Sequence, residues 1–231
     1  MWSFASLVPS LTELVFALGL GERLVARTGY CVHPRGAVEG IAMVGGTKDV
    51  NLAKLRRLAP THVVVNVDEN RLETVEAMRT WGADAPEIVV THPLGPADNP
   101  MLVGQLARAF AGVPGLEQRA AALSDALLRE LDATRPDDRL ERRVLYLIWH
   151  EPWMTIARDT YLSQMLARIG WHTLPALEGG PNGAARYPKL DGSEPWLRDV
   201  EFVLLSSEPF AFDATHVEQA QRLCPMARVM P

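Results

Sequence analysis

The chain has 231 residues, 48% of them hydrophobic and 22% charged, and its formal net charge is −5. This length is enough for one large domain or for two small lobes that each have a core. Because the balance is acidic and basic residues are not clustered, the composition argues against nucleic acid and anionic membranes as partners. No apolar run approaches the roughly 20 residues that span a bilayer.

The N-terminal segment, residues 1–8, has no positively charged region and only a short apolar run, which predicts a core strand and not a signal peptide. As written, the chain is expected in the cytoplasm, whereas a leader removed before residue 1 would place it in the periplasm or at the cell surface. Cys31 and Cys224 belong to no CxxC or metal-binding spacing. Two free thiols are therefore expected, with a disulfide between them as the alternative.

The first part of the chain alternates between strand and helix patterns, as an α/β lobe does. Short apolar, β-branched runs between helices are typical of buried parallel strands. Ser10 and Glu13 fit a capping box at the start of the first helix, and Asn51 fits the cap of the second. An N-terminal α/β lobe is expected over residues 1–97. Its later strands are predicted at Leu24–Thr28, Thr61–Asn66 and Glu87–Thr91, with helices at Leu52–Leu58 and Glu69–Trp81.

Residues 98–139 are predicted to be a helical linker, with one break at Val113–Gly115. After the break, apolar residues recur every three or four positions and form one stripe on a continuous helix, Pro114–Thr134. About twenty residues at the α-helical rise give roughly 30 Å, the width of a small domain. An ordinary crossover helix is the alternative, but this helix separates two α/β runs. A polar turn is predicted at Arg135–Arg139.

A second α/β lobe is expected over residues 140–231. Ser193 is predicted to cap a short helix that has Glu194 and Pro195 in its first turn. The chain ends on a strand pattern, which leaves open a further helix beyond Pro231. The strands are predicted at Val144–Trp149, Phe202–Ser206 and Arg228–Pro231, and the helices at Thr160–Ile169 and Ala214–Leu223.

Several motifs, in the same order and spacing, resemble the class III substrate-binding proteins, the helical backbone metal receptors that serve ABC importers of cobalamin, haem and ferric siderophores. Of these branches the chain looks most like the cobalamin-binding one, and the resemblance covers nearly its whole length. In the first lobe the motifs are Ser6-Leu-Val-Pro-Ser-Leu-Thr-Glu-Leu14, Gly45-Gly-Thr47 and Leu58-Ala-Pro-Thr-His-Val-Val-Val65; in the second they are Glu151-Pro-Trp-Met-Thr155, Asp159-Thr-Tyr-Leu-Ser163 and Leu204-Leu-Ser-Ser-Glu-Pro-Phe210.

The resemblance implies two Rossmann-like α/β lobes joined by one long rigid backbone helix, with a shallow cleft between the lobes. It also implies a monomeric, non-catalytic protein that needs no cofactor. Its ligand would be cobalamin or another metal chelate, and its partner would be an ABC permease.

Ligands of open α/β sheets bind outside the carboxyl ends of the strands. A corrinoid is a large, partly apolar ring with amide arms, so aromatic faces and a few polar tips suit it. By resemblance, Tyr30 and either Trp149 or Trp153 match aromatic ligand contacts of the family; core packing is the alternative for the tryptophans. The residues predicted to contact ligand are Pro9, Tyr30, His33, Asn66, Trp149, His150, Trp153, Tyr187 and Glu208, the last with Pro209 and Phe210, and Asp68 and Glu69 follow Asn66.

His33 and His150 are the two imidazoles on predicted ligand loops, and either could supply an axial nitrogen to cobalt or iron. A hydrogen-bonding loop residue is the plainer interpretation of both. The other four histidines, His62, His92, His172 and His216, are interpreted as structural or surface residues. No histidine and carboxylate spacing indicates a metal ion held by the protein alone.

In members that serve importers, the resemblance implies one glutamate on each lobe that docks into arginines of the permease. Glu194 falls at the second-lobe position. At the first-lobe position the chain has Ala53 and Lys54, and this change of charge should weaken docking to a basic socket. A corrinoid-binding protein of the cytoplasm that is not coupled to transport is therefore an alternative.

Two other functions are weighed against corrinoid binding. Haem or a ferric siderophore is the alternative ligand for the same fold, although Arg158 and Arg186 are the only guanidiniums near the predicted ligand loops. A hydrolase is the remote alternative. Ser206 and Thr160 offer hydroxyl groups, but no Gly-x-Ser-x-Gly elbow or ordered base accompanies them.

Overall fold

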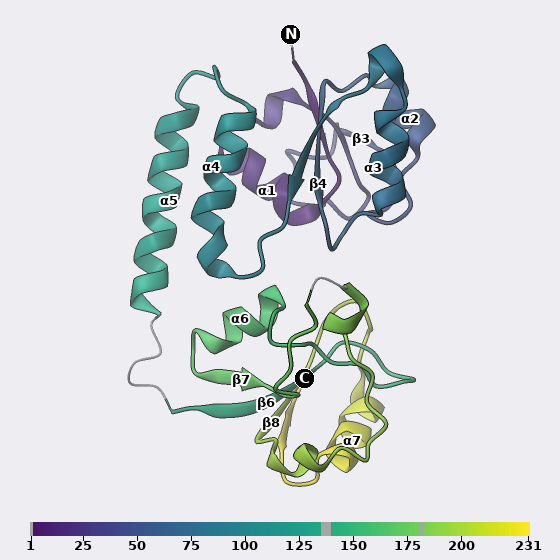
Figure 1. The fold of residues 1–231 in the computed structure, drawn as a ribbon, viewed down its shortest axis with the longest axis vertical. Helices are drawn as coiled ribbons and strands as arrows, with labels where there is room; N and C mark the ends of the chain where they lie inside the picture. Colours follow the sequence, from purple (N-terminus) through teal and green to yellow (C-terminus); the bar gives the residue numbers. More distant parts are fainter. Residues whose placement is uncertain (1, 135–139, 181–182) are drawn as a thin grey trace. The chain divides into compact units, whose positions relative to one another are not determined.

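A computed structural model describes residues 2–134, 140–180 and 183–231. The polar turn predicted at Arg135–Arg139 lies outside the described residues. The chain divides into two compact units, called here the first lobe (Met1–His92 with Asn99–Leu128) and the second lobe (Pro93–Asp98 with Arg129–Pro231). Each lobe contains a parallel sheet, as the α/β prediction requires (Figure 1).

The first lobe is built on a five-stranded parallel sheet with the strand order β3-β2-β1-β4-β5. In β4, the adjacent residues Val63 and Val64 are both fully buried, and they belong to cores on opposite faces of the sheet. A strand covered on both faces has no polar side to alternate with, which explains its uninterrupted apolar sequence. The strands are β1 (Phe4–Ser6), β2 (Leu24–Arg27), β3 (Ala42–Met43), β4 (His62–Asn66) and β5 (Glu87–Thr91).

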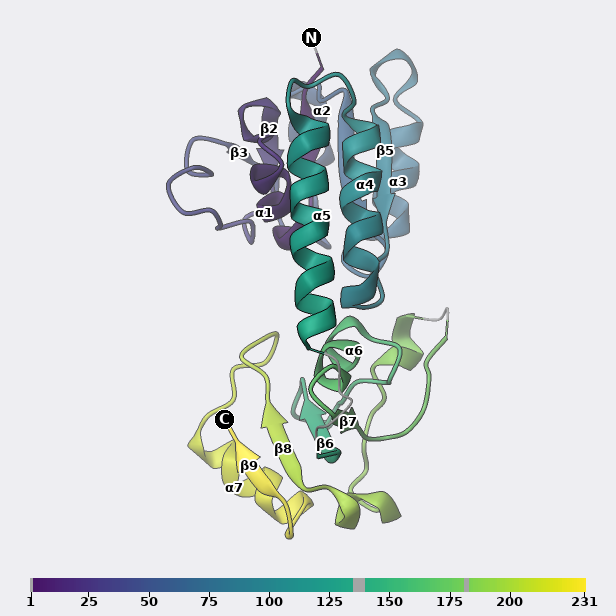
Figure 2. The ribbon, with the colours of Figure 1, turned by 90° about the vertical axis from the view of Figure 1, so that its left-hand side faces the viewer.

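Helices cover both faces of this sheet. On one face α1 (Pro9–Ala17), α4 (Asn99–Ala109) and α5 (Leu116–Ala133) pack around a core that contains Phe4 and Phe110. Figures 1 and 2 show α4 and α5 side by side. The opposite face is covered by α2 (Leu52–Arg57) and α3 (Leu72–Arg79).

The stripe predicted along α5 is the side of the helix that packs. Leu116 and Ala120 are buried in the first-lobe core, and Leu123 and Leu127 pack against it. The helix has 18 residues, and the division between the lobes falls within it, at Leu128.

The helix caps show which local predictions held. Asn51 caps α2, because its side chain accepts a hydrogen bond from the N–H of Lys54 at 2.9 Å. The capping box at Ser10 and Glu13 is wrong. Pro9 opens α1 one residue before Ser10, the N-cap position falls on Val8, and no side chain caps it.

The second lobe has a four-stranded parallel sheet with the order β7-β6-β8-β9. Its core joins the sheet to α7 through residues such as Leu145, Val203 and Ala220. The strands are β6 (Arg142–Leu147), β7 (Trp171–Thr173), β8 (Phe202–Leu205) and β9 (Arg228–Met230), and the α-helices are α6 (Tyr161–Ala167) and α7 (Ala214–Leu223).

Short 3-10 helices complete the described chain. The helix predicted after Ser193 is one of them, but Ser193 does not cap it: its N–H and hydroxyl both donate to Asp191. The 3-10 segments are Gly21–Arg23, Gly82–Asp84, Pro96–Asp98, Gly183–Arg186 and Pro195–Asp199. Among the residues with described positions, no helix has the length and apolar character that crossing a membrane requires.

Candidate ligand-binding site

Each sheet has a point where consecutive connections leave in opposite directions. In the first lobe β1 leads to β2 on one side, whereas β4 leads to β5 on the other. In the second lobe β6 leads to β7, and β8 leads to β9 in the opposite direction. Ligands of open α/β sheets bind outside the carboxyl ends of the strands at such switch points. The loops after β1, β4, β6 and β8 are therefore the candidate ligand loops.

In the first lobe, the predicted residues lie at this carboxyl edge. Pro9 is in the first turn of α1, directly after β1, and Tyr30 and His33 are exposed in the loop that follows β2. Asn66 is the last residue of β4, and its Oδ1 accepts hydrogen bonds from the N–H groups of Asp68 at 2.8 Å and Glu69 at 3.3 Å. Asn66 thus lies at the carboxyl edge of the sheet and also stabilises the loop that follows it.

Large apolar side chains at this edge are exposed. Tyr30 is 66% exposed, and Val32 follows it at 52%. Met43, at the end of β3, is 53% exposed, and Val67, directly after β4, is 52% exposed. These exposed side chains are available to contact a partly apolar ligand.

In the second lobe, the loops after β6 and β8 are joined by aromatic and imidazole rings. Phe210 lies 5.4 Å from Trp149, 6.0 Å from His150 and 5.0 Å from His216, measured between ring centroids. The His150 ring is also edge-on to Trp153 at 4.4 Å and to His216 at 4.9 Å. These five residues, with Phe212, are called the ring cluster below.

The loop after β6 is a tight turn that positions its three rings. Ile148 donates to the carbonyl of Met154 at 3.0 Å, and Met154 donates back to Trp149 at 3.1 Å. Trp149 remains 40% exposed, whereas Trp153 is half-buried and packs against the second-lobe core. Trp153 therefore takes part in core packing, the alternative that the sequence left open.

His216 was interpreted from the sequence as a structural or surface residue, and the structure adds it to the ring cluster. Asp213 and His216 form the capping box of α7, with His216 Nδ1 2.7 Å from the Asp213 carboxylate. The hydrogen bond that the Asp213 carboxylate accepts from the His216 N–H lowers the pKa of Asp213. The signal in the sequence was an aspartate three residues before a histidine at a helix start.

Glu208 and Tyr187 lie near the second-lobe edge in different settings. Glu208 is exposed in the loop after β8, two residues before Phe210. Tyr187 is half-buried and follows the buried Arg186, whose Nε is 3.8 Å from the Asp159 carboxylate. Burial would raise the pKa of Asp159, but hydrogen bonds from the N–H groups of Gly179 and Gly180 outweigh it and lower that pKa.

The predicted docking positions differ in their surroundings. The Glu194 carboxylate accepts hydrogen bonds from the N–H groups of Asp191 and Gly192, both at 2.9 Å, so it closes its own turn. Ala53 is exposed in the first turn of α2, beside the half-buried Lys54. The structure thus gives Glu194 a local role that the sequence did not indicate.

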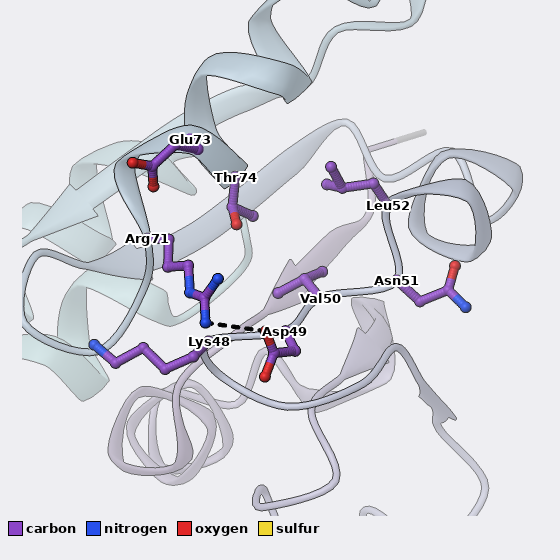
Figure 3. Close-up of a pocket in the computed structure, with 8 residues that line it drawn as sticks. All are labelled: Lys48, Asp49, Val50, Asn51, Leu52, Arg71, Glu73 and Thr74. Carbon is purple, nitrogen blue, oxygen red and sulfur yellow. Dashed lines mark ion pairs between the residues drawn. The ribbon is translucent and has the colours of Figure 1, made fainter.

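An open pocket of about 440 Å³ lies in the first lobe between the starts of α2 and α3 (Figure 3). It contains none of the residues predicted from the sequence to bind ligand. Its lining residues are Lys48, Asp49, Val50, Asn51, Leu52, Arg71, Glu73 and Thr74.

Metal-ligating residues are not gathered in the part of the chain with described positions, where no group of three or more histidines, cysteines or carboxylates could hold an ion. Cys31 and Cys224 are free and buried, so the alternative of a disulfide between them is not realised. Burial raises the pKa of the Cys224 thiol to about 11.

The sequence is similar to those of vitamin B12-binding proteins. It is 23% identical to the one from Vibrio campbellii over 215 residues, which cover 92% of this chain and 74% of that protein. It is 24% identical to the one from Vibrio parahaemolyticus over 208 residues, 90% of this chain and 72% of that protein. No protein-family model matches the chain.

Solved structures with the same fold cover almost the whole chain. The periplasmic vitamin B12-binding protein of Vibrio cholerae has a TM-score of 0.75 at 19% identity, over 99% of this chain and 87% of that one. The periplasmic haem-binding protein of the same organism has a TM-score of 0.76 at 20% identity, over 99% and 88%. These comparisons confirm the resemblance found in the motifs: the chain has the α/β fold of the class III substrate-binding proteins.

Proposed function

We propose that this chain is a non-catalytic binding protein for a corrinoid or a related metal chelate. The observation that carries the proposal is the ring cluster at the switch point of the second sheet. There the loops after β6 and β8 and the start of α7 present indole, phenyl and imidazole rings whose neighbouring centroids lie 4.4–6.0 Å apart. The sequence similarity to proteins named for vitamin B12 binding supports the same ligand class.

A corrinoid suits the chemistry of both carboxyl edges. Its flat ring system is partly apolar, and aromatic side chains contact such surfaces with a large area and little loss of conformational freedom. Trp149 in the second lobe and Tyr30 in the first are the exposed aromatic residues there, at 40% and 66%. Asn66 and Glu208 supply polar groups at the same edges, which the amide arms of a corrinoid can meet.

An enzymatic function is not favoured by the hydroxyl groups that the sequence suggested. The hydroxyl group of Thr160 donates a hydrogen bond to the carbonyl oxygen of Ala157 at 2.9 Å. The Asp159 carboxylate accepts hydrogen bonds from two backbone N–H groups. Ser206 is 5% exposed. A nucleophile needs an ordered base within hydrogen-bonding reach and access to substrate, and neither hydroxyl meets both conditions.

Coupling to an ABC permease is the finer part of this proposal. Glu194 is the candidate docking carboxylate, although two backbone N–H groups already bind it. Ala53 removes the corresponding charge from the first lobe, and Lys54 adds an opposite one. We therefore expect a weaker contact with a basic permease surface than a pair of free carboxylates would give.

Haem is the second candidate ligand, and one observation favours it. His150 and His216 place two imidazoles 4.9 Å apart inside the ring cluster, and imidazole nitrogen is a common ligand of haem iron. Structures with this fold include haem-binding proteins.

One titration distinguishes these ligands. The purified protein is mixed with cyanocobalamin, aquocobalamin, haemin or a ferric hydroxamate, and the absorption spectrum and melting temperature are followed. A ligand that binds the folded state raises the melting temperature by mass action. Corrinoid binding is expected to raise it with a saturable dependence on concentration. A shift with haemin alone would assign the chain to haem, and no shift with any chelate would refute the proposal.

A further inference from the structure

Asn70 is a buried residue that joins three segments at the carboxyl edge of the first sheet. It is 7% exposed. Its Nδ2 donates hydrogen bonds to the carbonyl oxygens of Leu7, at 3.2 Å, and Thr47, at 3.0 Å. Its Oδ1 accepts a hydrogen bond from the N–H of Asn66 at 2.9 Å. One side chain thus links the segments that follow β1 and β3 to the end of β4.

The chemistry of these contacts requires an amide. A neutral amide group offers two N–H donors and one carbonyl acceptor, and here every one of those functions has a backbone partner. A carboxylate of the same shape has no donor, and it would place negative charge against two carbonyl oxygens. An apolar side chain would leave all three backbone groups without this partner, which is costly in a buried position.

Each segment held by Asn70 leads to a candidate ligand residue. Leu7 comes two residues before Pro9, and Asn66 is itself a candidate. Thr47 follows Gly46, which lies so close to the Tyr30 ring that a Cβ atom there would be 3.3 Å from the ring edge. The position of the loop around Thr47 therefore limits the space that the exposed Tyr30 ring can occupy on that side.

Two exposed contacts also join the loops that Asn70 holds. The ammonium group of Lys48 donates a hydrogen bond to the carbonyl oxygen of Asp68. Arg71 forms an ion pair with Asp49 at 3.2 Å, which is the dashed line in Figure 3. The side chains of Arg71 and Asp49 are 57% and 83% exposed, and ion pairs in such positions contribute little. Lys48, Asp49 and Arg71 also line the open pocket between α2 and α3. The buried hydrogen bonds of Asn70 are therefore the principal contacts that hold these loops together.

We propose that Asn70 is a positioning residue for ligand binding in the first lobe. Its side chain is buried and hydrogen-bonded to backbone groups, and it fixes the backbone of the three segments that carry or support Pro9, Tyr30 and Asn66. Binding is stronger when such loops are already in their bound conformation, because ordering them costs free energy. This inference rests on the proposed function for its ligand, but the holding of the loops can be measured without one.

The test is the substitution Asn70→Asp, with the dissociation constant for cyanocobalamin measured between about pH 7.5 and pH 4.5. At the upper pH we expect about ten-fold weaker binding than wild type, since the carboxylate supplies neither donor. As the pH falls, a protonated carboxyl donates to one carbonyl and accepts from the Asn66 N–H, so affinity should recover. Wild type, measured at each pH, serves as the reference over this range.

Asp49→Asn is the matched control, since it replaces a carboxylate by an amide in the exposed ion pair with Arg71. The affinity of this variant for cyanocobalamin should stay within about two-fold of wild type. Equal binding by wild type and Asn70→Asp at pH 7.5 would overturn the inference, as would weaker binding that does not recover at low pH. If Asn70→Asp does not fold, Asn70→Ser keeps one donor, and wild-type affinity in that variant would overturn it.

Hydrogen exchange in the ligand-free protein separates this inference from the proposed function. The N–H groups of Asn66, Asp68 and Glu69 should exchange faster in Asn70→Asp, because their hydrogen bonds depend on the loop that Asn70 holds. The exchange rates of the N–H groups in α4 should not change. Unchanged exchange at residues 66–69 would overturn the inference even if the wild type binds a corrinoid. Failure of the wild type to bind any chelate would instead refute the proposed function.

Discussion

The indole ring of Trp149 and the phenyl ring of Phe210 meet nearly edge to face, with centroids 5.4 Å apart and an interplanar angle of 68°. They come from the loops after β6 and β8, the two neighbouring strands whose connections run in opposite directions along the second sheet. This pair is therefore one of the contacts that join the two loops of the ring cluster across the switch point.

Phe210→Ala should weaken corrinoid binding by about ten-fold or more, since aromatic residues at the centre of a site contribute most of its affinity. The ring also touches His150, Phe212 and His216, so its loss loosens the whole cluster. Isothermal titration with cyanocobalamin measures the effect. Phe202→Ala is the control, because Phe202 stacks on Trp171 at 5.1 Å, at the start of β8 and away from the carboxyl edge. Equal losses of affinity in both variants would contradict the role of the ring cluster.

Tyr30→Ala should separate binding from stability. The side chain is 66% exposed, so its removal should change the free energy of unfolding by less than about 0.5 kcal/mol, as surface substitutions usually do. We expect the affinity for cyanocobalamin to fall by about ten-fold, because an exposed aromatic face is lost from the ligand edge. Met226→Ala, at a residue that is 83% exposed, should affect neither quantity. An unchanged affinity in Tyr30→Ala would remove Tyr30 from the site.

Asp159→Asn should alter the acid side of the stability profile. The pKa of Asp159 is lowered in the folded state despite its burial, because the N–H groups of Gly179 and Gly180 bind the carboxylate. Its stabilising contribution is therefore complete above the unfolded pKa of about 3.9 and is lost as the pH falls through the lower folded value. The variant should be less stable than wild type at neutral pH, and the difference should shrink as the pH approaches 3.

Urea unfolding at several pH values measures that difference. The control is Asp84→Asn, since Asp84 is 62% exposed in its pair with Arg56 and should contribute at most about 1 kcal/mol. A stability difference for Asp159→Asn that grows toward acid pH would show that the sign of this argument is wrong.

Both cysteines should resist thiol reagents until the protein unfolds. Cys31 and Cys224 are free and have no exposed surface, and burial raises the pKa of Cys224 to about 11. The thiolate is the reactive form, and it is scarce well below the pKa. Labelling at pH 8 should be slow in buffer and reach two thiols per chain in denaturant. Rapid labelling of either residue in the native protein would contradict its burial.

Regular elements with a clear pattern were predictable from the sequence, but two of the short strands were not. The bounds predicted for β5, Glu87–Thr91, and for α7, Ala214–Leu223, are those of the structure. The strands β3 and β7 were missed because a run of two or three residues is too short to show an alternating pattern. The capping box at Ser10 failed because Pro9 already satisfied the geometry of the first helical turn.

The candidate site was predictable only where a residue follows directly from the end of a strand. Trp149 and Asn66 could be placed in this way, because parallel strands bring their carboxyl ends to one edge. The ring contacts of His216 and the hydrogen bonds of Asn70 could not, since they depend on partners brought together by the fold. Asn70 bonds to Leu7, 63 positions earlier in the chain, and no local pattern encodes that contact.

Equilibrium binding of cyanocobalamin to the purified chain tests the central claim most directly. Titration calorimetry under matched buffer conditions gives both the stoichiometry and the dissociation constant. The proposal predicts saturable binding of one corrinoid per chain, weakened in Phe210→Ala and in Tyr30→Ala and unchanged in Met226→Ala. No heat and no saturation with cyanocobalamin or aquocobalamin, from a chain that unfolds cooperatively on heating, would contradict it.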